Sequence, residues 1–343
     1  MDKLHQLNPN NEQLKLSYEN CWRFIIRPIR DRYFLSELDY PEKVLRNPSN
    51  CYIREDYTVL SRRGFLMQCS FYRMDLSKRD PYIRPVIIYL HGNSSSRIEG
   101  SKAAMFLINY GIDLFVFDFP GCGRSEGEYI SLGYYEKDDV KTIVDFVEKL
   151  PGVGKIGIWG RSMGASTALM YSYLDNRIKA QCVDSPFATF RDMAIKLVKK
   201  HINLPEFIIN SILYFVKKTI KNKINLDLED LKPIDCAPLS KTPTFFIHAM
   251  KDDLIPYEHT IQIYEKYAGI KSINITEGDH NTARPMSLYF NTLYFFLKYL
   301  DDKYKEDNEE YEESEECYED EDDIKTNTDN NNVINNTLFS DSQ

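Results

Sequence analysis

A series of short apolar runs, separated by longer stretches with helical spacing, constrains the fold of this 343-residue chain more than any other feature. Most of the runs are nearly continuous in apolar residues, which is typical of strands that are covered on both faces of a sheet. The first two are joined by a tight turn containing Gly64 and predict an antiparallel hairpin. The runs are residues 57–60, 65–72, 86–90, 112–119, 155–160, 179–184, 244–249 and 272–276.

The stretches between the runs have the spacing of helices that pack on a sheet. Val140, Ile143, Val144 and Val147 stand at positions i, i+3, i+4 and i+7, so they share one apolar stripe. Alternating strands and helices predict an α/β fold with a doubly wound, mostly parallel sheet and a leading antiparallel hairpin. Ligands bind at the carboxyl ends of the strands in such sheets, so we expect the chemistry in the loops that follow the strands.

Composition divides the chain into three parts. Residues 1–24 form a polar N-terminal segment, and residues 25–300 are predicted to form the α/β domain, with a helical insert at 188–236 in the position of a cap. Residues 301–343 form an acidic and Asn-rich tail with too little apolar surface to fold, so we predict that it is disordered. The tail is either an interaction segment for a basic partner or a solvated spacer.

The formal net charge of −9 is unevenly distributed. Residues 301–323 contain 15 acidic residues and two lysines, so the chain without its tail is net positive. Because the whole chain is negatively charged, we expect no nucleic-acid partner. The basic, aliphatic-rich insert is a candidate for binding an acyl chain and for a peripheral contact with an anionic membrane. The alternative is a cap helix that packs its apolar face on the core and leaves its lysines in solvent. These lysines are Lys196, Lys199, Lys200, Lys217, Lys218, Lys221 and Lys223.

The cysteines and the N-terminus bear on cellular location. The seven cysteines are odd in number, far apart and without a CxxC pair, so the sequence predicts neither a disulfide framework nor a metal site. The first 20 residues lack the apolar stretch of a signal peptide. We therefore predict a cytoplasmic protein, with a peripheral membrane contact left open. Residues 121–126 resemble a dinucleotide-binding fingerprint, but Glu126 replaces the required Gly or Ala, so we expect no cofactor.

The run at 155–160 leads into Gly160-Arg161-Ser162-Met163-Gly164 and then into a helix start with small residues. This is GxSxG between a strand and a helix, which is the context of a nucleophile elbow. The sharp turn forces strained backbone angles on the serine, and a Cβ on either glycine would strike the neighbouring strand or helix. Ser162 is therefore the predicted nucleophile.

A serine hydroxyl needs a base that removes its proton and a carboxylate that orients the base. Asp252 is the first carboxylate beyond the run at 244–249, and His280 lies in the loop before a final helix at 286–299. The order Ser, Asp, His is that of α/β-hydrolases. We prefer His280 to the other five histidines, since none of those occupies a loop between a terminal strand and a final helix.

Three other carboxylates near these positions are weaker candidates for the acid. We expect Asp253 to cap the turn after Asp252, Asp279 to form a local turn, and Asp184 to be a less favoured substitute acid.

The backbone amides that would receive an oxyanion are also predictable. One donor is the residue after the nucleophile, Met163, and the other comes from the loop after the run at 86–90. In that loop Gly92 permits a close approach of substrate, and the amide of Asn93 is the expected donor. We expect His91 to tether the loop.

Together the segments HGNSSS, FDFPGCGRSEG, GRSMG, HAMKDD and GDHN resemble the α/β-hydrolase superfamily of serine hydrolases over residues 25–300. The chain is most similar to the branch with serine aminopeptidase-like, prolyl-oligopeptidase-like and acyl-protein thioesterase-like members. The resemblance implies Ser162 as nucleophile, His280 as base, Asp252 as orienting acid, and Asn93 and Met163 as oxyanion donors. In the HGxxD pattern before the acid, Ala249 replaces the glycine.

The predicted function is that of a serine hydrolase that cleaves a carboxylic ester, with a small-molecule or lipid acyl substrate, through an acyl-enzyme. An acyl-protein thioesterase and a serine peptidase or aminopeptidase are the alternatives of the same chemistry. The alternative of another class is a catalytically silent protein that uses the pocket only to bind a ligand.

Overall fold

The computed structural model describes residues 18–38, 44–47, 50–74, 83–201 and 206–304. The chain divides into two units, Met1–Asp302 and Lys303–Gln343. Residues 1–17 and 305–343, which include most of the predicted N-terminal segment and nearly all of the predicted tail, lie outside the described residues. Among the helices of the described residues, none is long and apolar enough to span a bilayer.

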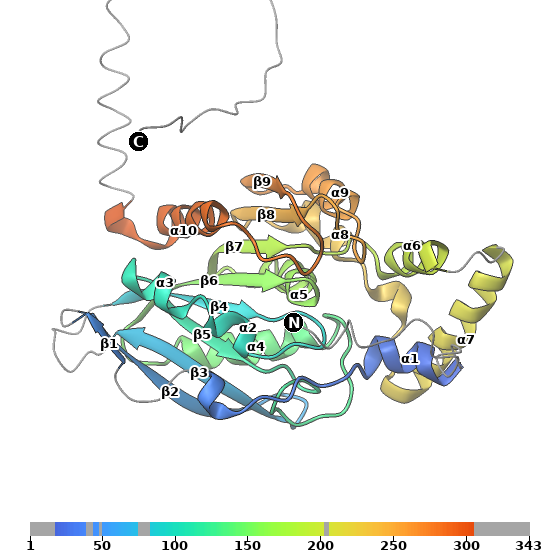
Figure 1. The fold of residues 1–343 in the computed structure, drawn as a ribbon, viewed down its shortest axis with the longest axis horizontal. Helices are drawn as coiled ribbons and strands as arrows, with labels where there is room; N and C mark the ends of the chain where they lie inside the picture. The colour runs from blue at the N-terminus through green and yellow to red at the C-terminus, as the bar shows by residue number, and fades with distance from the viewer. Residues whose placement is uncertain (1–17, 39–43, 48–49, 75–82, 202–205, 305–343) are drawn as a thin grey trace, which may run out of the picture. The chain divides into compact units, whose positions relative to one another are not determined.

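The described strands form one nine-stranded sheet in the order β1-β2-β3-β5-β4-β6-β7-β8-β9 (Figure 1). The first three neighbouring pairs are antiparallel, and the remaining pairs are parallel. The predicted fold, a mostly parallel sheet with a leading antiparallel hairpin, is confirmed. The strands are β1 (Val44–Asn47), β2 (Asn50–Leu60), β3 (Leu66–Met74), β4 (Arg84–Leu90), β5 (Asp113–Phe117), β6 (Val153–Arg161), β7 (Ile178–Asp184), β8 (Thr244–Ala249) and β9 (Lys271–Thr276).

The predicted hairpin is longer in the structure than the apolar runs indicate. β2 and β3 pair from Tyr52 with Met74 to Leu60 with Leu66, and Gly64 takes the positive φ of 82° that the turn requires. The edge strand β1 was not predicted, because its four residues lack an apolar run and form a strand by pairing with β2.

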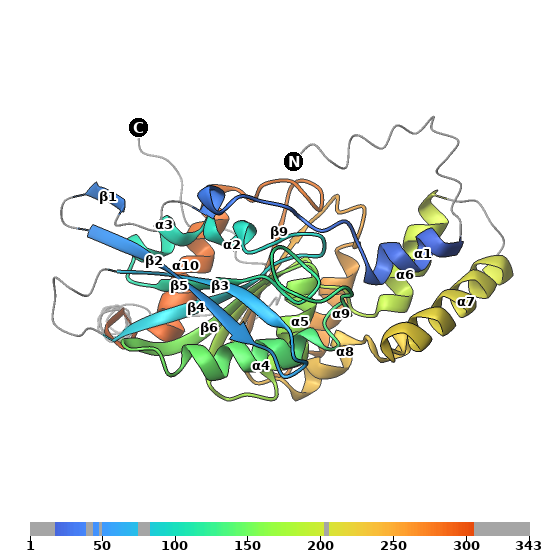
Figure 2. The same ribbon diagram turned by 90° about the horizontal axis from the view of Figure 1, so that it is seen from below.

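Helices cover both faces of the sheet. Side chains alternate along β6, so Gly157 and Trp159 face one side and Gly160 faces the other. A Cβ on Gly157 would touch Phe296 of α10, and Trp159 packs on the same ring, whereas a Cβ on Gly160 would strike the start of α5. In Figure 2 α4 lies below the sheet. The helices are α1 (Tyr18–Ile26), α2 (Ile98–Ser101), α3 (Ala104–Asn109), α4 (Glu136–Val147), α5 (Met163–Ser172), α6 (Phe190–His201), α7 (Glu206–Ile224), α8 (Pro233–Cys236), α9 (Glu258–Lys266) and α10 (Met286–Leu300), with 3-10 turns at Leu35–Leu38, Leu228–Asp230 and Ala237–Leu239.

The segment predicted as a helical insert contains α6, α7 and α8, between β7 and β8 (Figure 1). Helix α7 packs beside α1 near the start of the chain, and Lys223 Nζ lies 4.2 Å from the centroid of the Trp22 ring. Trp22 and Ile26 are buried in the core. Helix α1 therefore crosses the boundary predicted between residues 24 and 25, because one face of this short helix is apolar and packs on the body.

Candidate active site

Ser162 stands at the tip of a sharp turn between β6 and α5. Its backbone angles, φ 53° and ψ −115°, lie outside the helical and extended regions. Its N–H donates to the Asp184 carbonyl at 2.7 Å, which ties the turn to the end of β7. A Cβ on Gly164 would lie 2.0 Å from the Leu90 carbonyl oxygen, and one on Gly160 would lie 2.4 Å from the Gly164 oxygen. Both glycines are therefore required for this turn.

The structure brings Ser162, His280 and Asp252 together from the ends of three strands. His280 Nε2 lies 3.1 Å from Ser162 Oγ, and His280 Nδ1 lies 2.6 Å from Asp252 Oδ2. The three residues follow β6, β9 and β8, respectively, and each is at most 7% exposed. The residues chosen from chain order thus form one continuous line of hydrogen-bonding groups.

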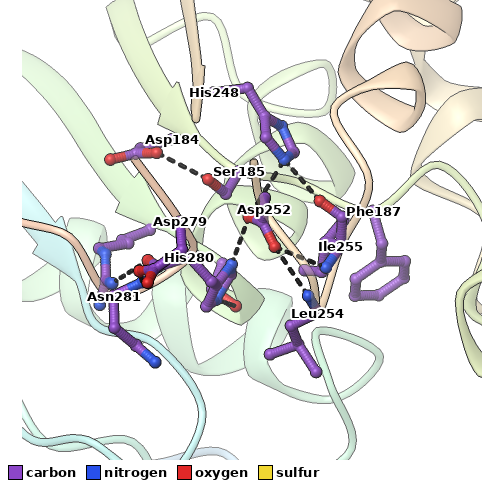
Figure 3. Close-up of polar contacts among 12 residues, drawn as sticks. Asp184, Ser185, Phe187, His248, Asp252, Leu254, Ile255, Asp279, His280 and Asn281 are labelled. Carbon is purple, nitrogen blue, oxygen red and sulfur yellow. Dashed lines mark hydrogen bonds and ion pairs between the residues drawn. The ribbon is translucent and has the colours of Figure 1, made fainter. Parts of the chain in front are cut away.

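Besides His280, three other groups hold the Asp252 carboxylate (Figure 3). Its Oδ1 accepts the N–H groups of Leu254 at 3.0 Å and Ile255 at 2.7 Å. His248 Nε2 lies 3.2 Å from Oδ2. Burial favours the neutral acid, but the hydrogen bonds from His248 and His280 outweigh it and hold the pKa of Asp252 well below its usual value. Asp252 thus also binds N–H groups of the turn that follows it.

The ionised Asp252 sets the tautomer of His280. A carboxylate only accepts, so His280 Nδ1 donates to it, and in the neutral imidazole Nε2 is then the acceptor that faces the Ser162 hydroxyl. His248 is oriented in a similar way: its Nε2 donates to the Ile255 carbonyl at 2.7 Å, while Nδ1 accepts from the Thr260 hydroxyl at 2.6 Å. This second histidine was not predicted as a site residue, and its signal in the sequence is the HGxxD pattern.

The loop after β4 lies beside the serine. His91 is fully buried; its Nε2 accepts the Phe119 N–H at 3.0 Å and its Nδ1 donates to the Gly92 carbonyl at 2.8 Å, so the ring fixes the loop. The point where a Gly92 Cβ would lie is 3.6 Å from Ser162 Cβ, and the glycine leaves that space open.

The two expected oxyanion donors, Asn93 and Met163, directly follow Gly92 and Ser162 in the chain. Met163 is the first residue of α5, so its N–H has no acceptor within the helix. Among the described residues, no loop hydrogen bond uses the N–H of Met163 or Asn93.

Two of the weaker acid candidates have other partners. Asp184 forms a bidentate ion pair with Arg284: Nε donates to Oδ2 at 2.9 Å, and Nη2 donates to Oδ1 at 2.8 Å. Burial raises the pKa of Asp184, but the charge and hydrogen bonds of Arg284 more than compensate and keep it low. Asp279 Oδ1 accepts the N–H groups of Asn281 and Thr282, both at 2.8 Å, as expected of a turn former.

Two further charged residues of the site were not singled out from the sequence. Arg161 Nη2 donates to the His280 carbonyl at 2.6 Å, and Glu99 Oε2 accepts the Gly92 N–H at 3.3 Å. No local pattern marks either residue, since their partners are distant in the chain. Within the described part of the chain, no group of three or more His, Cys, Asp or Glu side chains could hold a metal ion.

Comparison with known proteins shows similarity both in sequence and in structure. A family model described as the alpha/beta hydrolase fold matches residues 85–210. The uncharacterised protein YqkD of Bacillus subtilis is 30% identical over 222 residues, which cover 63% of this chain and 72% of YqkD. The lysophosphatidylserine lipase ABHD12 of Danio rerio is 27% identical over 201 residues, 55% of this chain and 49% of that protein, so the match spans only about half of ABHD12.

Among solved structures, esterase Pf2001 of Pyrococcus furiosus superposes with a TM-score of 0.57 at 22% identity, covering 76% of this chain and 98% of that one. An acetyl xylan esterase from Paenibacillus sp. R4 gives a TM-score of 0.59 at 19% identity, covering 76% and 88%. At these identities the two structures show a shared fold.

Proposed function

Because this chain belongs to the α/β-hydrolase superfamily, we propose that it is a serine hydrolase that cleaves carboxylic esters of small-molecule or lipid acyl substrates. The observation that carries the proposal is the line from Asp252 through His280 to Ser162, with distances of 2.6 and 3.1 Å. A carboxylate, an imidazole and a hydroxyl in this order are the groups that make a serine nucleophilic.

In the first half of the reaction Ser162 Oγ attacks the ester carbonyl while His280 Nε2 takes the hydroxyl proton. The imidazolium that forms is stabilised by Asp252, whose low pKa keeps it ionised at neutral pH. The carbonyl oxygen becomes an oxyanion and accepts the N–H groups of Asn93 and Met163. His280 then gives its proton to the leaving alkoxide, and the acyl group stays on Ser162.

In the second half water releases the acyl group. His280 removes a proton from water, the hydroxide attacks the acyl carbonyl, and the carboxylic acid leaves as Ser162 regains its proton. Both halves use the same base and the same amides, so one arrangement of side chains serves both.

The choice of an ester over other acyl substrates rests on similarity. A lysophosphatidylserine lipase is among the relatives and two esterases are among the solved structures, which supports an ester. An acyl-protein thioesterase and a serine peptidase or aminopeptidase use the same groups and are the alternatives. A catalytically silent ligand-binding protein is the alternative outside catalysis. The 3.1 Å distance between His280 Nε2 and Ser162 Oγ argues against it.

A panel of p-nitrophenyl esters, acyl thioesters and aminoacyl amides of graded chain length tests the proposal. We expect turnover that is fastest on esters and is lost in Ser162→Ala. Faster turnover of thioesters or amides would replace the ester by that class, and no turnover on any substrate would refute the proposal.

We further propose a cytoplasmic enzyme that contacts anionic membranes through α7. Cys69, Cys122, Cys182 and Cys236 are free thiols, which suits a reducing compartment. Tyr214 is 62% exposed, and Lys218 and Lys221 are exposed one and two turns further along the same helix. Aromatic and basic side chains on one helix face are typical of interfacial binding. Lys217 Nζ forms an ion pair with Asp227 Oδ1 at 3.0 Å, so this lysine is less available to bind lipid.

A further inference from the structure

Arg161 links two parts of the site from the position next to the nucleophile. Its Nη2 donates to the backbone carbonyl of His280 at 2.6 Å, and its Nη1 lies 3.6 Å from Glu99 Oε1. The side chains of Arg161 and Glu99 are only 24% and 15% exposed. One side chain of the elbow therefore anchors the backbone of the residue that carries the base.

Glu99 of α2 binds both the end of β4 and the loop that follows it. Its Oε2 accepts the Gly92 N–H at 3.3 Å, and its Oε1 accepts the Tyr89 hydroxyl at 2.9 Å. The point where a Gly92 Cβ would lie is 3.6 Å from both Glu99 Oε2 and Ser162 Cβ. A carboxylate therefore lies close to the place where the oxyanion forms.

An unpaired carboxylate in this place would oppose catalysis. The negative charge of the oxyanion develops beside the Gly92 loop, and repulsion between partly buried charges is weakly screened by solvent. The guanidinium of Arg161, whose Nη1 lies 3.6 Å from Glu99 Oε1, opposes that field. Glu99 can then hold the Gly92 N–H without destabilising the transition state.

We propose that Arg161 and Glu99 are a positioning pair for the reaction: Arg161 holds the His280 backbone and neutralises Glu99, and Glu99 holds the loop that carries the Asn93 donor. Neither residue touches the reacting atoms. This inference rests on the proposed function, since it concerns how the base and the oxyanion donors of the same serine hydrolase site are held in position.

A second arginine holds the His280 loop from a different direction. Arg284 Nη1 donates to the carbonyls of Asp279 at 3.2 Å and Thr282 at 3.1 Å, and its guanidinium is paired with the buried Asp184. The loop thus keeps several anchors when Arg161 is removed. Loss of Arg161 should therefore alter the rate of the reaction more than the folding of the chain.

The test is steady-state kinetics of Arg161→Met on the best ester of the panel, with thermal unfolding measured in parallel. Met fills a similar volume but has neither charge nor donors. We expect kcat to fall about 100-fold while KM changes less than about threefold, because the lost interactions act mainly in the transition state. The matched control is Arg62→Met, at an exposed arginine 3.3 Å from Asp145 on the surface, which should keep kcat within about twofold.

Rescue separates a positioning role from a merely structural one. Glu99→Gln keeps an acceptor for the Gly92 N–H but removes the charge, so the double variant Arg161→Met/Glu99→Gln should regain about tenfold in kcat over Arg161→Met. A kcat of Arg161→Met equal to that of the control, or a double variant no faster than Arg161→Met, would overturn the inference.

If Arg161→Met does not fold, Arg161→Lys carries the test. Lysine keeps the charge beside Glu99 but lacks the fork that also reaches the His280 carbonyl, so we expect kcat to fall about tenfold. An unchanged kcat would overturn the inference. Failure of the proposed function itself would look different, since the wild-type chain would then turn over no substrate of the panel.

Discussion

The loops at the carboxyl ends of the strands and the helical insert have opposite physical characters. In the loops, Ser162, Asp252 and His280 are at most 7% exposed, and each side chain has a hydrogen-bond partner. On α7, Tyr214 and Phe215 are more than half exposed, and exposed lysines follow them. The side chains of Ser162, Asp252 and His280 are therefore held in place by the body of the fold. The insert presents exposed aromatic and basic side chains, which form the surface that we propose contacts a membrane.

Substitution of the nucleophile or of the base should reduce kcat more than any other change proposed here. Ser162→Ala and His280→Ala should each lower kcat by about 10⁴-fold or more, because the first removes the attacking hydroxyl and the second removes the base that activates it. The double variant should be no slower than the single ones, since the residues act as one unit. Ester hydrolysis checks this, and additive losses would contradict a shared mechanism.

Two glycines of the same region should separate stability from activity. Gly164→Ala places a Cβ 2.0 Å from backbone oxygen, so we expect a loss of more than about 3 kcal/mol in the free energy of unfolding. At Gly92 a Cβ meets its nearest atoms at 3.6 Å, so Gly92→Ala should cost less than about 1 kcal/mol.

The Gly92→Ala methyl would nonetheless occupy the space beside Ser162 Cβ, and we expect kcat/KM to fall about 100-fold. Urea unfolding and ester kinetics of both variants check the pair of predictions. Similar stability losses in the two variants would show that the space beside Ser162 is not open for substrate.

The junction between the body and the insert should be sensitive to pH. His259 of α9 accepts the Ala188 N–H at 3.2 Å, and burial together with the charge of Lys196 lowers its pKa from 6.5 to about 4. The unfolded chain therefore binds more protons between these values, so stability falls as the pH falls. From pH 7 to pH 5 this group should cost about 2 kcal/mol.

His259→Asn keeps an acceptor for the Ala188 N–H but does not titrate. Urea unfolding at the two pH values should show about 2 kcal/mol less pH dependence in this variant than in the wild-type chain. Equal pH dependence in both would mean that His259 is not held neutral at the junction.

The smallest expected effect lies on the insert itself. Lys218→Gln/Lys221→Gln should weaken binding to phosphatidylserine vesicles at low salt about 10- to 30-fold, since each lysine near an anionic surface contributes about 1 kcal/mol. Turnover of a water-soluble ester should not change. The control Lys241→Gln/Lys266→Gln removes two exposed lysines elsewhere and should bind like wild type. Equal binding by all three proteins would exclude α7 as the membrane contact.

The sequence predicted the parts of the fold and site that depend on local pattern. Continuous apolar runs marked the buried strands, and GxSxG, Asp252 and His280 could be placed because each follows such a run. The structure brings these residues together because the carboxyl ends of parallel strands meet at one edge of the sheet.

The parts that the sequence did not predict depend on contacts between distant residues. Strand β1 is short and lacks an apolar run, so only its pairing with β2 defines it. Likewise, Arg161 has no local pattern that points to Glu99 or to the His280 carbonyl. His248 supports Asp252 only because the turn after β8 folds back toward that strand.

Reaction of the full chain with a fluorophosphonate probe, with the adduct located by mass spectrometry, tests whether Ser162 is an activated nucleophile. We predict a single adduct on Ser162, absent from Ser162→Ala and slowed strongly in His280→Ala. A folded chain that stays unmodified, or one modified equally after Ser162→Ala, would contradict the claim.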